Sequence, residues 1–380
     1  MIRKNFQNLK LPALGFGAMR LPVIGGDYAQ IDEAATSEMV ACAMERGVNY
    51  FDTAWGYHNG QSETVMGKIL GKYARESYFL ADKFPGYELS NMDKAEAIFE
   101  EQLKKCGVAY FDFYMLHNVC EMNIDAYLDE KHGVCEYLIK QKRAGRIRHL
   151  GFSAHGRYDV MKRFLEAYGN AMEFCQIQLN YVDWVFQDAK AKTGLLNEHQ
   201  IPIWVMEPLR GGQLASLSEA DAAALKSLRP EEKIPAWAFR FIQSIPNVTI
   251  TLTGVSNFEQ LKDNINTYQE ERPLNQQEME VLRGIAERMV NQSIVPCTAC
   301  RYCLNHCPQR LDIPNLLNLY NEHCFTVTAG GLGFIAPMAL MALPEEKHPK
   351  ACTACRNCEA VCPQQLKIAD AMADFTERLN

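Results

Sequence analysis

Four side chains that together could move a proton onto an oxygen atom occur near the predicted ends of successive strands. Asp52 and Tyr57 lie five residues apart, directly after the apolar run at residues 48–51. Lys83 and His117 lie near the ends of the next two apolar runs. A phenol exchanges its proton more readily beside an ammonium, because the positive charge lowers the phenol pKa. We therefore expect Lys83, held by Asp52, to make Tyr57 more acidic, and His117 to orient the oxygen that accepts the proton.

Each of these residues taken alone has an ordinary structural explanation. A carboxylate can cap a turn, a phenol or an imidazole can be a satisfied core group, and a lysine can be a surface charge. Their joint occurrence near the ends of successive predicted strands is what indicates an active site, because barrel enzymes place their chemistry at strand ends. The four residues are therefore one candidate catalytic group.

Apolar and amphipathic segments alternate through most of the chain, which predicts strands that alternate with helices after a short hairpin arm near residues 6–11. The predicted strands cover residues 13–19, 48–52, 78–84, 111–117, 148–153, 174–180, 203–206 and 248–253. The predicted helices cover residues 37–46, 62–73 with Ser62 as the cap, 92–105, 134–142, 158–167, 187–198, 235–243 and 257–267. Eight such alternations in about 285 residues favour an α/β fold of the TIM-barrel type, a closed parallel (β/α)8 barrel, over an open doubly wound sheet.

The totals of the sequence exclude several classes of protein. A chain of 380 residues is longer than one compact core usually is, so two domains are expected, and a hydrophobic content of 48% excludes disorder. A net charge of -7 without a basic run argues against nucleic-acid binding. The polar N-terminus lacks a secretory signal, which predicts a cytoplasmic protein. The most apolar run, residues 330–343, contains Pro337 and is shorter than the roughly 20 residues of a spanning helix, so no membrane association is expected.

Two similar cysteine runs near the C-terminus account for most of the 14 cysteines. Each has the spacing C-x2-C-x2-C-x3-C-P, in which three thiolates hold one [4Fe-4S] cluster and the fourth ligates the neighbouring cluster. The predicted ligands are Cys297, Cys300, Cys303 and Cys362 for one cluster and Cys352, Cys355, Cys358 and Cys307 for the other. Zinc also binds paired C-x2-C motifs, but a zinc site does not require a fourth cysteine followed by proline in both runs. The remaining cysteines are expected to be small buried hydrophobes.

Residues 10 to about 285 resemble the aldo-keto reductase family. The resemblance rests on the four candidate catalytic residues in their local sequences, including Ala81-Asp-Lys-Phe-Pro and Tyr114-Met-Leu-His-Asn, and on Gly151-Phe-Ser and Gln176-Ile-Gln-Leu-Asn. It implies reduction of a carbonyl by hydride from NADP(H) or NAD(H), without a Rossmann unit. Hydride transfer to the carbonyl carbon leaves an alkoxide, for which Tyr57 is the expected proton donor.

The resemblance also implies where the cofactor lies. Ser153 and Gln176 would hydrogen-bond the nicotinamide carboxamide. The other implied contacts are Met206 at the nicotinamide, Glu207, Leu209 and Arg210 in the turn around the pyrophosphate, and Gly254, Ser256, Gln260 and Asn264 near the adenosine end.

Three departures from the family pattern concern the cofactor. Ala154 lies where an asparagine often follows the serine, and Met206 lies where an aromatic residue usually stacks on the nicotinamide. Gly254 and Gln260 lie where many relatives carry Lys and Arg for the 2'-phosphate of NADP, so NADP and NAD both remain open. Arg210 is expected to be either a phosphate ligand or a solvated surface arginine.

The cysteine region resembles a bacterial dicluster ferredoxin module. Cys307 and Cys352 are farther apart than in the compact type, and residues 313–320 and 368–379 have helical periodicity, so the resemblance is to the mainly helical variety. The sequence predicts an aldo-keto reductase-like barrel over residues 1–289 and a ferredoxin-like iron-sulfur domain over residues 290–380. In single-domain relatives the segment after the barrel covers its mouth, so this domain is expected to border the substrate pocket.

Three functional hypotheses follow. The first is a reductase of a small carbonyl substrate, or an alcohol dehydrogenase in reverse, with clusters that are structural or linked to a ferredoxin-like redox partner. The second is a redox-sensing or electron-transfer protein whose barrel binds a nicotinamide cofactor, and the third is an enzyme that uses both cluster electrons and hydride. Hydride carries two electrons and a cubane accepts one, so direct exchange between cofactor and cluster is not implied.

Overall fold

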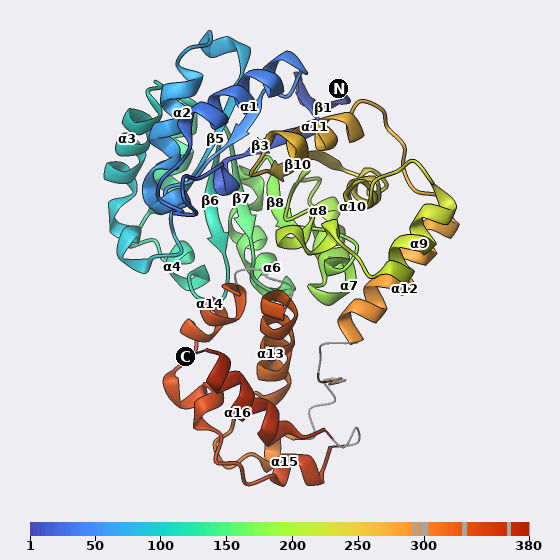
Figure 1. The fold of residues 1–380 in the computed structure, drawn as a ribbon. Coiled ribbons are helices and arrows are strands. Elements are labelled where there is room, and N and C mark those ends of the chain that lie inside the picture. Colours follow the sequence, from blue (N-terminus) through green and yellow to red (C-terminus); the bar gives the residue numbers. More distant parts are fainter. Residues whose placement is uncertain (292–294, 296, 298–302, 329–332, 363–365, 380) are drawn as a thin grey trace.

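The computed structural model describes residues 1–291, 295, 297, 303–328, 333–362 and 366–379. Its larger part is a barrel of strands surrounded by helices, and its smaller part is a group of C-terminal helices. This smaller part lies at the end of the barrel towards which strand β6 (Phe111–Val119) points (Figure 1). The predicted cluster ligand Cys300 lies outside the described residues.

The strands after the N-terminal hairpin are parallel and close on themselves in the order β10-β3-β4-β5-β6-β7-β8-β9. Besides β6, they are β3 (Leu14–Gly17), β4 (Tyr50–Asp52), β5 (Phe79–Phe84), β7 (Ile147–Ala154), β8 (Cys175–Gln178), β9 (Ile203–Met206) and β10 (Val248–Gly254). The predicted (β/α)8 barrel is therefore confirmed. Parallel strands covered by helices are buried on both faces, which explains their nearly continuous apolar sequence.

Helices cover the outside of the barrel (Figure 1). They are α1 (Glu33–Glu45), α2 (Ser62–Leu70), α3 (Ala95–Cys106), α4 (Ile124–Leu128), α5 (Val134–Arg143), α6 (Tyr158–Tyr168), α7 (Asp183–Phe186), α8 (Ala189–Glu198), α9 (Glu219–Leu228), α10 (Ile234–Gln243), α11 (Phe258–Thr267) and α12 (Gln276–Asn291). Short 3-10 helices are η1 (Ala18–Arg20), η2 (Tyr57–Gly60), η3 (Arg75–Ser77), η4 (Leu89–Lys94), η5 (Gly169–Ala171) and η6 (Arg210–Ala215).

The start of α2 differs from the prediction. Ser62 is the first residue of this helix and not its cap. Its hydroxyl lies 2.9 Å from Thr53 Oγ1 and donates to the Ala18 carbonyl at 3.3 Å. The side chain therefore ties the helix to the loops beside the barrel mouth. Helix α1 begins earlier than the predicted residue 37 and has a side-chain cap, because the Asp32 carboxylate accepts from its third backbone N–H.

The predicted hairpin arm is formed by β1 (Arg3–Phe6) and β2 (Leu9–Pro12), and it closes the amino-terminal end of the barrel. Phe6 and Leu11 are buried there with aromatic side chains from the barrel interior. The Phe6 ring lies edge-on to Trp204 at a centroid distance of 5.1 Å. One end of the barrel is thus plugged, and the carboxyl ends of the strands form the open mouth.

The C-terminal helices have an apolar core of their own, which includes Leu316, Leu340 and Phe375. Their elements are η7 (Leu304–His306), α13 (Ile313–Thr328), α14 (Ile335–Met341), η8 (Glu345–Lys347), η9 (Pro349–Ala351), α15 (Asn357–Ala360) and α16 (Ile368–Arg378). In the part of the chain that the structure describes, no helix is both long and apolar enough to cross a membrane.

Candidate functional site

The four predicted catalytic residues meet at the barrel mouth. Asp52 ends β4, Lys83 and His117 lie near the ends of β5 and β6, and Tyr57 begins η2. The Lys83 ammonium donates to Asp52 Oδ1 at 2.5 Å and to the Tyr57 hydroxyl at 3.4 Å. The Tyr57 and His117 rings lie edge to face, with 6.2 Å between their centroids. The predicted group is therefore one spatial cluster.

The local backbone explains how Tyr57 reaches the cluster. Its N–H donates to the Ala54 carbonyl, which forms a turn directly after β4. Gly56 lets the loop pass close to Tyr87, because a Cβ at this position would lie 2.5 Å from the Tyr87 hydroxyl. His58 follows in the left-handed region and holds the loop, since its Nε2 accepts from the Leu21 N–H at 3.1 Å.

The Asp52–Lys83 ion pair is almost fully buried. Burial raises the pKa of Asp52, and the nearby ammonium opposes this shift. Burial lowers the pKa of Lys83, but Asp52 and Tyr57 raise it more, so its net shift is upward. Lys83 also donates to the Thr53 carbonyl at 2.8 Å. The lysine is therefore a fixed cation at neutral pH.

The pKa of Tyr57 is raised, whereas we expected Lys83 to lower it. Burial raises its pKa to about 12, and the attraction of Lys83 only partly offsets this effect. The sequence-based argument counted the cation and omitted the loss of solvent around the phenol. Tyr57 is therefore protonated at neutral pH, as a proton donor must be.

His117 is a neutral imidazole in this site. Burial lowers its pKa well below the ordinary value, and the charge of Lys83 acts in the same direction. Its Nδ1 is buried and has no hydrogen-bond partner among the described residues. Tyr87, which the sequence did not single out, lies edge-on to this ring at 5.3 Å. A neutral His117 can donate one hydrogen bond to a substrate oxygen.

The residues expected at the nicotinamide lie on neighbouring strands, with Ser153 on β7 and Gln176 on β8. Ser153 Oγ accepts from the Asn118 N–H at 2.8 Å. Gln176 Nε2 points to the sulfur of Met206 at 3.7 Å, and its Oε1 is buried without a partner among the described residues. The two side chains therefore keep one donor and one acceptor for another group.

The turn after β9 is held by its own side chains. The Glu207 carboxylate accepts from the Gly211 N–H and forms an ion pair with Arg20 at 3.1 Å. Leu209 is partly buried against the barrel core. Arg20, on η1, was not predicted to belong to the site. Its aliphatic part lies beside Gly254, so a cation lies close to a position where many relatives carry one and where the Gly254 of this chain led us to expect none.

Arg210 is not the solvated arginine that was one of our two expectations, because only 3% of it is exposed. Its Nε donates to Asp183 Oδ1 at 3.0 Å, and its Nη1 donates to Thr326 Oγ1 of α13 at 3.2 Å. Its Nη2 lies 3.9 Å from the Glu322 carboxylate, also on α13. Arg210 therefore joins the turn after β9 to the C-terminal helices.

The residues expected near the adenosine end surround the end of β10. Gly254 is exposed, and the Ser256 N–H donates to Gln260 Oε1 at 3.0 Å. Asn264 is buried, and its Nδ2 donates to Thr253 Oγ1 at 2.8 Å. Asn264 thus supports the strand end, and Gln260 shapes the loop that follows it.

Two C-terminal helices cover part of the barrel mouth (Figure 1). Asn118 Nδ2 lies 3.8 Å from the sulfur of Met338 on α14, and the Phe334 ring lies edge-on to His155 at 6.0 Å. The described part of the apolar run at residues 330–343 therefore packs partly against the barrel, next to His117. That the C-terminal segment borders the substrate pocket stays a prediction, and this contact is compatible with it.

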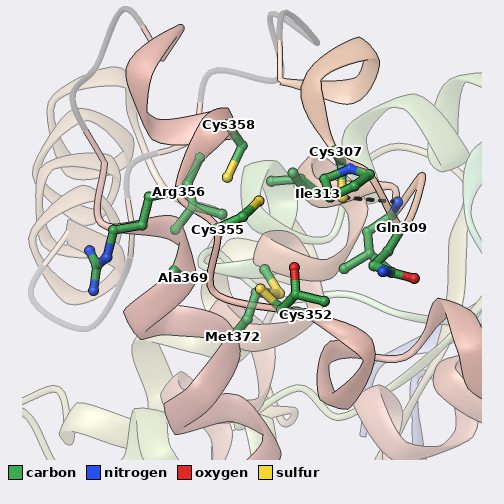
Figure 2. Close-up of a pocket in the computed structure, with 13 residues that line it drawn as sticks. Cys307, Gln309, Ile313, Cys352, Cys355, Arg356, Cys358, Ala369 and Met372 are labelled. Carbon is green, nitrogen blue, oxygen red and sulfur yellow. Dashed lines mark hydrogen bonds between the residues drawn. The ribbon is translucent and has the colours of Figure 1, made fainter.

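One predicted set of cluster ligands surrounds a single hollow in the C-terminal helices. This hollow is lined by Cys307, Cys352, Cys355 and Cys358. Its empty volume is about 350 Å³, which includes open solvent. Figure 2 shows these cysteines around the hollow. Leu311 N–H donates to Cys307 Sγ at 3.5 Å. Among the described residues, however, no group of three or more Cys, His, Asp or Glu side chains has the arrangement of a metal-ion site.

The other set is described only in part. Cys297, Cys303 and Cys362 are described, and Cys300 is not. Cys303 is buried in the apolar core of the C-terminal helices, and Cys297 and Cys362 pack against that core.

Comparison with known proteins agrees with the barrel fold. A model of the aldo/keto reductase family matches residues 13–287. L-galactose dehydrogenase of Arabidopsis thaliana is 26% identical over 308 residues, which cover 74% of this chain and 93% of that protein. A holo aldo-keto reductase from Bacillus halodurans superposes with a TM-score of 0.62 at 23% identity, covering 75% of this chain and 96% of that chain. An aldo-keto reductase from Klebsiella pneumoniae in complex with NADPH gives 0.60 at 17% identity, with the same coverage.

Proposed function

The chain belongs to the aldo/keto reductase family of NAD(P)-dependent oxidoreductases, and we propose that it reduces a small aldehyde or ketone to an alcohol. The observation that carries this proposal is the position of the Lys83 ammonium between the Asp52 carboxylate and the Tyr57 hydroxyl. Carbonyl reduction needs a proton donor where negative charge develops on oxygen, and a buried cation beside a protonated phenol meets that need.

The proposed chemistry on this chain concerns one proton. Neutral His117 donates a hydrogen bond to the carbonyl oxygen and orients it. As charge develops on that oxygen, Tyr57 transfers its hydroxyl proton to it, and Lys83 stabilises the phenolate that remains. Asp52 keeps the ammonium in place. When bound, the nicotinamide cofactor supplies the hydride.

The free hydrogen-bonding groups on β7 and β8 suit a nicotinamide carboxamide. Ser153 Oγ already accepts a hydrogen bond, so its hydrogen is left to donate to the carboxamide oxygen. Gln176 Oε1 lacks a partner among the described residues and can accept from the carboxamide nitrogen. We propose that the Glu207 turn and the end of β10 hold the pyrophosphate and the adenosine, with Arg20, which pairs with Glu207 and lies beside Gly254, as a cation near both. NADP and NAD are both compatible with this arrangement.

Removing the Lys83 charge is expected to change the pH dependence of alcohol oxidation. Oxidation needs the ionised phenol, so its rate rises as the pH approaches the Tyr57 pKa, which burial places at about 12. Lys83→Met removes the group that lowers this pKa and so shifts the rise to higher pH. Profiles of kcat against pH in both directions would measure the shift, with Lys68→Met, an exposed lysine of α2, as the control. Coincident profiles for Lys83→Met and the unaltered enzyme would contradict the assigned role.

We further propose that residues 290–380 form a domain with two [4Fe-4S] clusters. The hollow lined by Cys307, Cys352, Cys355 and Cys358 supports one of them. A cubane is bound at its corners, so its thiolates lie farther apart than the ligands of a single ion, which is compatible with the lack of a compact ion site among the described residues. The donor set is the one that the motif requires. Such clusters, when bound, supply one-electron transfer and cross-link the chain.

A redox-sensing or electron-transfer protein is the second candidate function, because Cys355 of the proposed cluster is exposed and therefore accessible to a partner such as a ferredoxin. Anaerobically purified protein with steady NAD(P)H-dependent turnover of simple aldehydes would favour the reductase. Tight cofactor binding without turnover, together with cluster reduction by a ferredoxin, would favour the sensor.

The contact of α14 with the barrel mouth predicts that this helix affects substrate choice. Met338→Ala is expected to change kcat/KM for bulky relative to small aldehydes by about tenfold, because one side chain in an apolar pocket contributes on this scale. Met341→Ala is the matched control, since this residue lies on the same helix and is 70% exposed. Equal substrate profiles for the two variants would show that α14 does not line the pocket.

A further inference from the structure

A buried hydrogen-bonded group lies directly behind the catalytic lysine. Asp82 precedes Lys83 in β5, and because successive side chains of a strand alternate, it points away from the barrel interior towards α2 and α3. Glu63 from α2 and Gln102 from α3 meet it there. All three side chains have no solvent exposure. Two carboxyl groups in such a place need compensation, because unpaired buried charge is costly.

The oxygen atoms around the Gln102 amide nitrogen outnumber the hydrogens that this nitrogen can donate. Its Nε2 lies 2.9 Å from Glu63 Oε1, 3.0 Å from Asp82 Oδ1 and 3.0 Å from the Lys83 carbonyl. An amide nitrogen carries two hydrogens, so it cannot satisfy three acceptors with full hydrogen bonds. Asp82 Oδ1 also accepts from the Lys83 N–H at 2.8 Å. The two carboxyl groups thus face the same amide nitrogen, Glu63 through Oε1 and Asp82 through Oδ1.

The need for a proton on the carboxyl pair holds in either orientation of the Gln102 amide. Its Oε1 accepts from the hydroxyl of Tyr114. The opposite orientation would point that oxygen at the Glu63, Asp82 and Lys83 oxygen atoms, which offer no hydrogen unless one carboxyl is protonated. Either way, the geometry calls for a proton on the carboxyl pair.

The charges around the pair do not remove this need. The titratable groups that face Asp82 are Glu63 of α2, Lys105 and Cys106 of α3, Lys83 of β5 and Tyr114 of β6. Lys105 pairs with Glu63 Oε2 at 2.9 Å, and the Lys83 ammonium is engaged by Asp52. Burial, and next the Glu63 carboxylate, raise the pKa of Asp82 well above its ordinary value. One cation therefore serves two carboxyl groups.

We propose that Asp82 and Glu63 share one proton at neutral pH, and that this singly charged pair acts as a positioning element for Lys83. The second half of the proposal rests on the reductase function. The pair and Gln102 together hold both ends of the Lys83 residue, since Asp82 accepts from its N–H and Gln102, which also contacts both carboxyl groups, donates to its carbonyl. Loss of the shared proton would place two negative charges there. Their repulsion would disturb the Lys83 backbone and with it the contact to Tyr57.

The proton itself can be tested without turnover. At pH 7, the infrared carbonyl band of protonated carboxylic acid is expected to lose the same component in Asp82→Asn and Glu63→Gln, because an amide replaces the protonated partner. Asp93→Asn is the matched control, since Asp93 is exposed, and its hydrogen bond with His132 lowers its pKa. A band that is equal in the unaltered protein and in both pair variants would overturn the proposal.

The stability of the fold gives an independent measure of the same proton. A carboxyl whose folded pKa is raised binds a proton that the unfolded chain has released, so its contribution is complete below the ordinary pKa and is lost as the pH rises towards the folded pKa. Asp82→Asn removes this pH-dependent contribution to the free energy of unfolding. The unfolding constant of the unaltered protein relative to that of Asp82→Asn should therefore rise with pH, by up to about tenfold per pH unit. A ratio that is independent of pH between about 5 and 9 would contradict the shared proton.

The positioning role is tested by a pair of substitutions at Asp82. Asp82→Ala is expected to lower kcat by about tenfold or more, because small misplacements of a catalytic group reduce the rate strongly. Asp82→Asn keeps the acceptor for the Lys83 N–H and a donor towards Glu63, so it should restore most of kcat and extend the activity to higher pH. Equal kcat values for the alanine variant and the unaltered enzyme would refute positioning. If the unaltered enzyme has no turnover, the reductase function fails, and the infrared and unfolding results still decide whether the proton is shared.

Discussion

Tyr57→Phe is expected to lower kcat for NAD(P)H-dependent aldehyde reduction by about 10²–10⁴-fold, the usual contribution of a positioned general acid. The phenylalanine ring keeps the contact with His117 and removes only the hydroxyl that faces Lys83 at 3.4 Å. Cofactor affinity should therefore change little. The measurement is steady-state kcat together with the cofactor Kd from fluorescence titration. A cofactor that binds normally while turnover is lost would locate the defect in proton transfer.

Tyr87→Phe is the matched control for this prediction. Tyr87 is a second phenol beside His117, with 5.3 Å between the ring centroids. The Lys83 ammonium donates to Asp52, Thr53 and Tyr57 and, among the described residues, not to Tyr87, so the loss of the Tyr87 hydroxyl should lower kcat much less than the loss of the Tyr57 hydroxyl. If Tyr57→Phe retained more than about a tenth of kcat, or if Tyr87→Phe were the more damaging variant, the assignment of the proton donor would be wrong.

Most of the barrel could be predicted from the sequence, because it is built from short-range patterns. The apolar runs and the amphipathic helices between them repeat along the chain, and strand ends such as Asp52 follow from that repeat. The ends of the elements were less predictable. Helix α13 continues to Thr328, beyond the expected residue 320, because its last turns pack against Arg210 of the barrel. That contact depends on tertiary structure.

The residues of the candidate site could be predicted from their types and their positions at strand ends. Properties that depend on burial, such as pKa values, could not. Asp52, Tyr57, Lys83 and His117 could be placed together because they follow neighbouring strands. The pKa of Tyr57 could not be predicted, since its upward shift comes mainly from burial. The same holds for the Arg210 ion pairs, whose partners lie on two other helices.

The prediction with the largest structural effect concerns the cysteines of the hollow. Under the proposed two-cluster domain, Cys355→Ser should remove one of the proposed clusters and lower the iron content from about eight to about four atoms per chain, because serine is a poor substitute for a thiolate ligand. Cys42→Ser, a substitution on α1 in the barrel, should leave the iron content unchanged. The measurement is iron and acid-labile sulfide per chain in anaerobically purified protein. Zinc without sulfide would favour the zinc alternative, and unchanged iron in Cys355→Ser would exclude Cys355 as a ligand.

Loss of this proposed cluster should also destabilise the helices that contact the barrel mouth. Ile313, at the start of α13, lines the hollow, while Thr326 near the end of the same helix contacts Arg210. Because bound metal centres contribute directly to the folding of small domains, α13 and α16 should exchange their amide hydrogens about 10²-fold faster in Cys355→Ser. The cover over the barrel mouth would then loosen, and kcat/KM should fall although the barrel residues are intact. Unchanged exchange in α13 together with unchanged kcat/KM would mean that the cluster does not hold the helices over the barrel mouth.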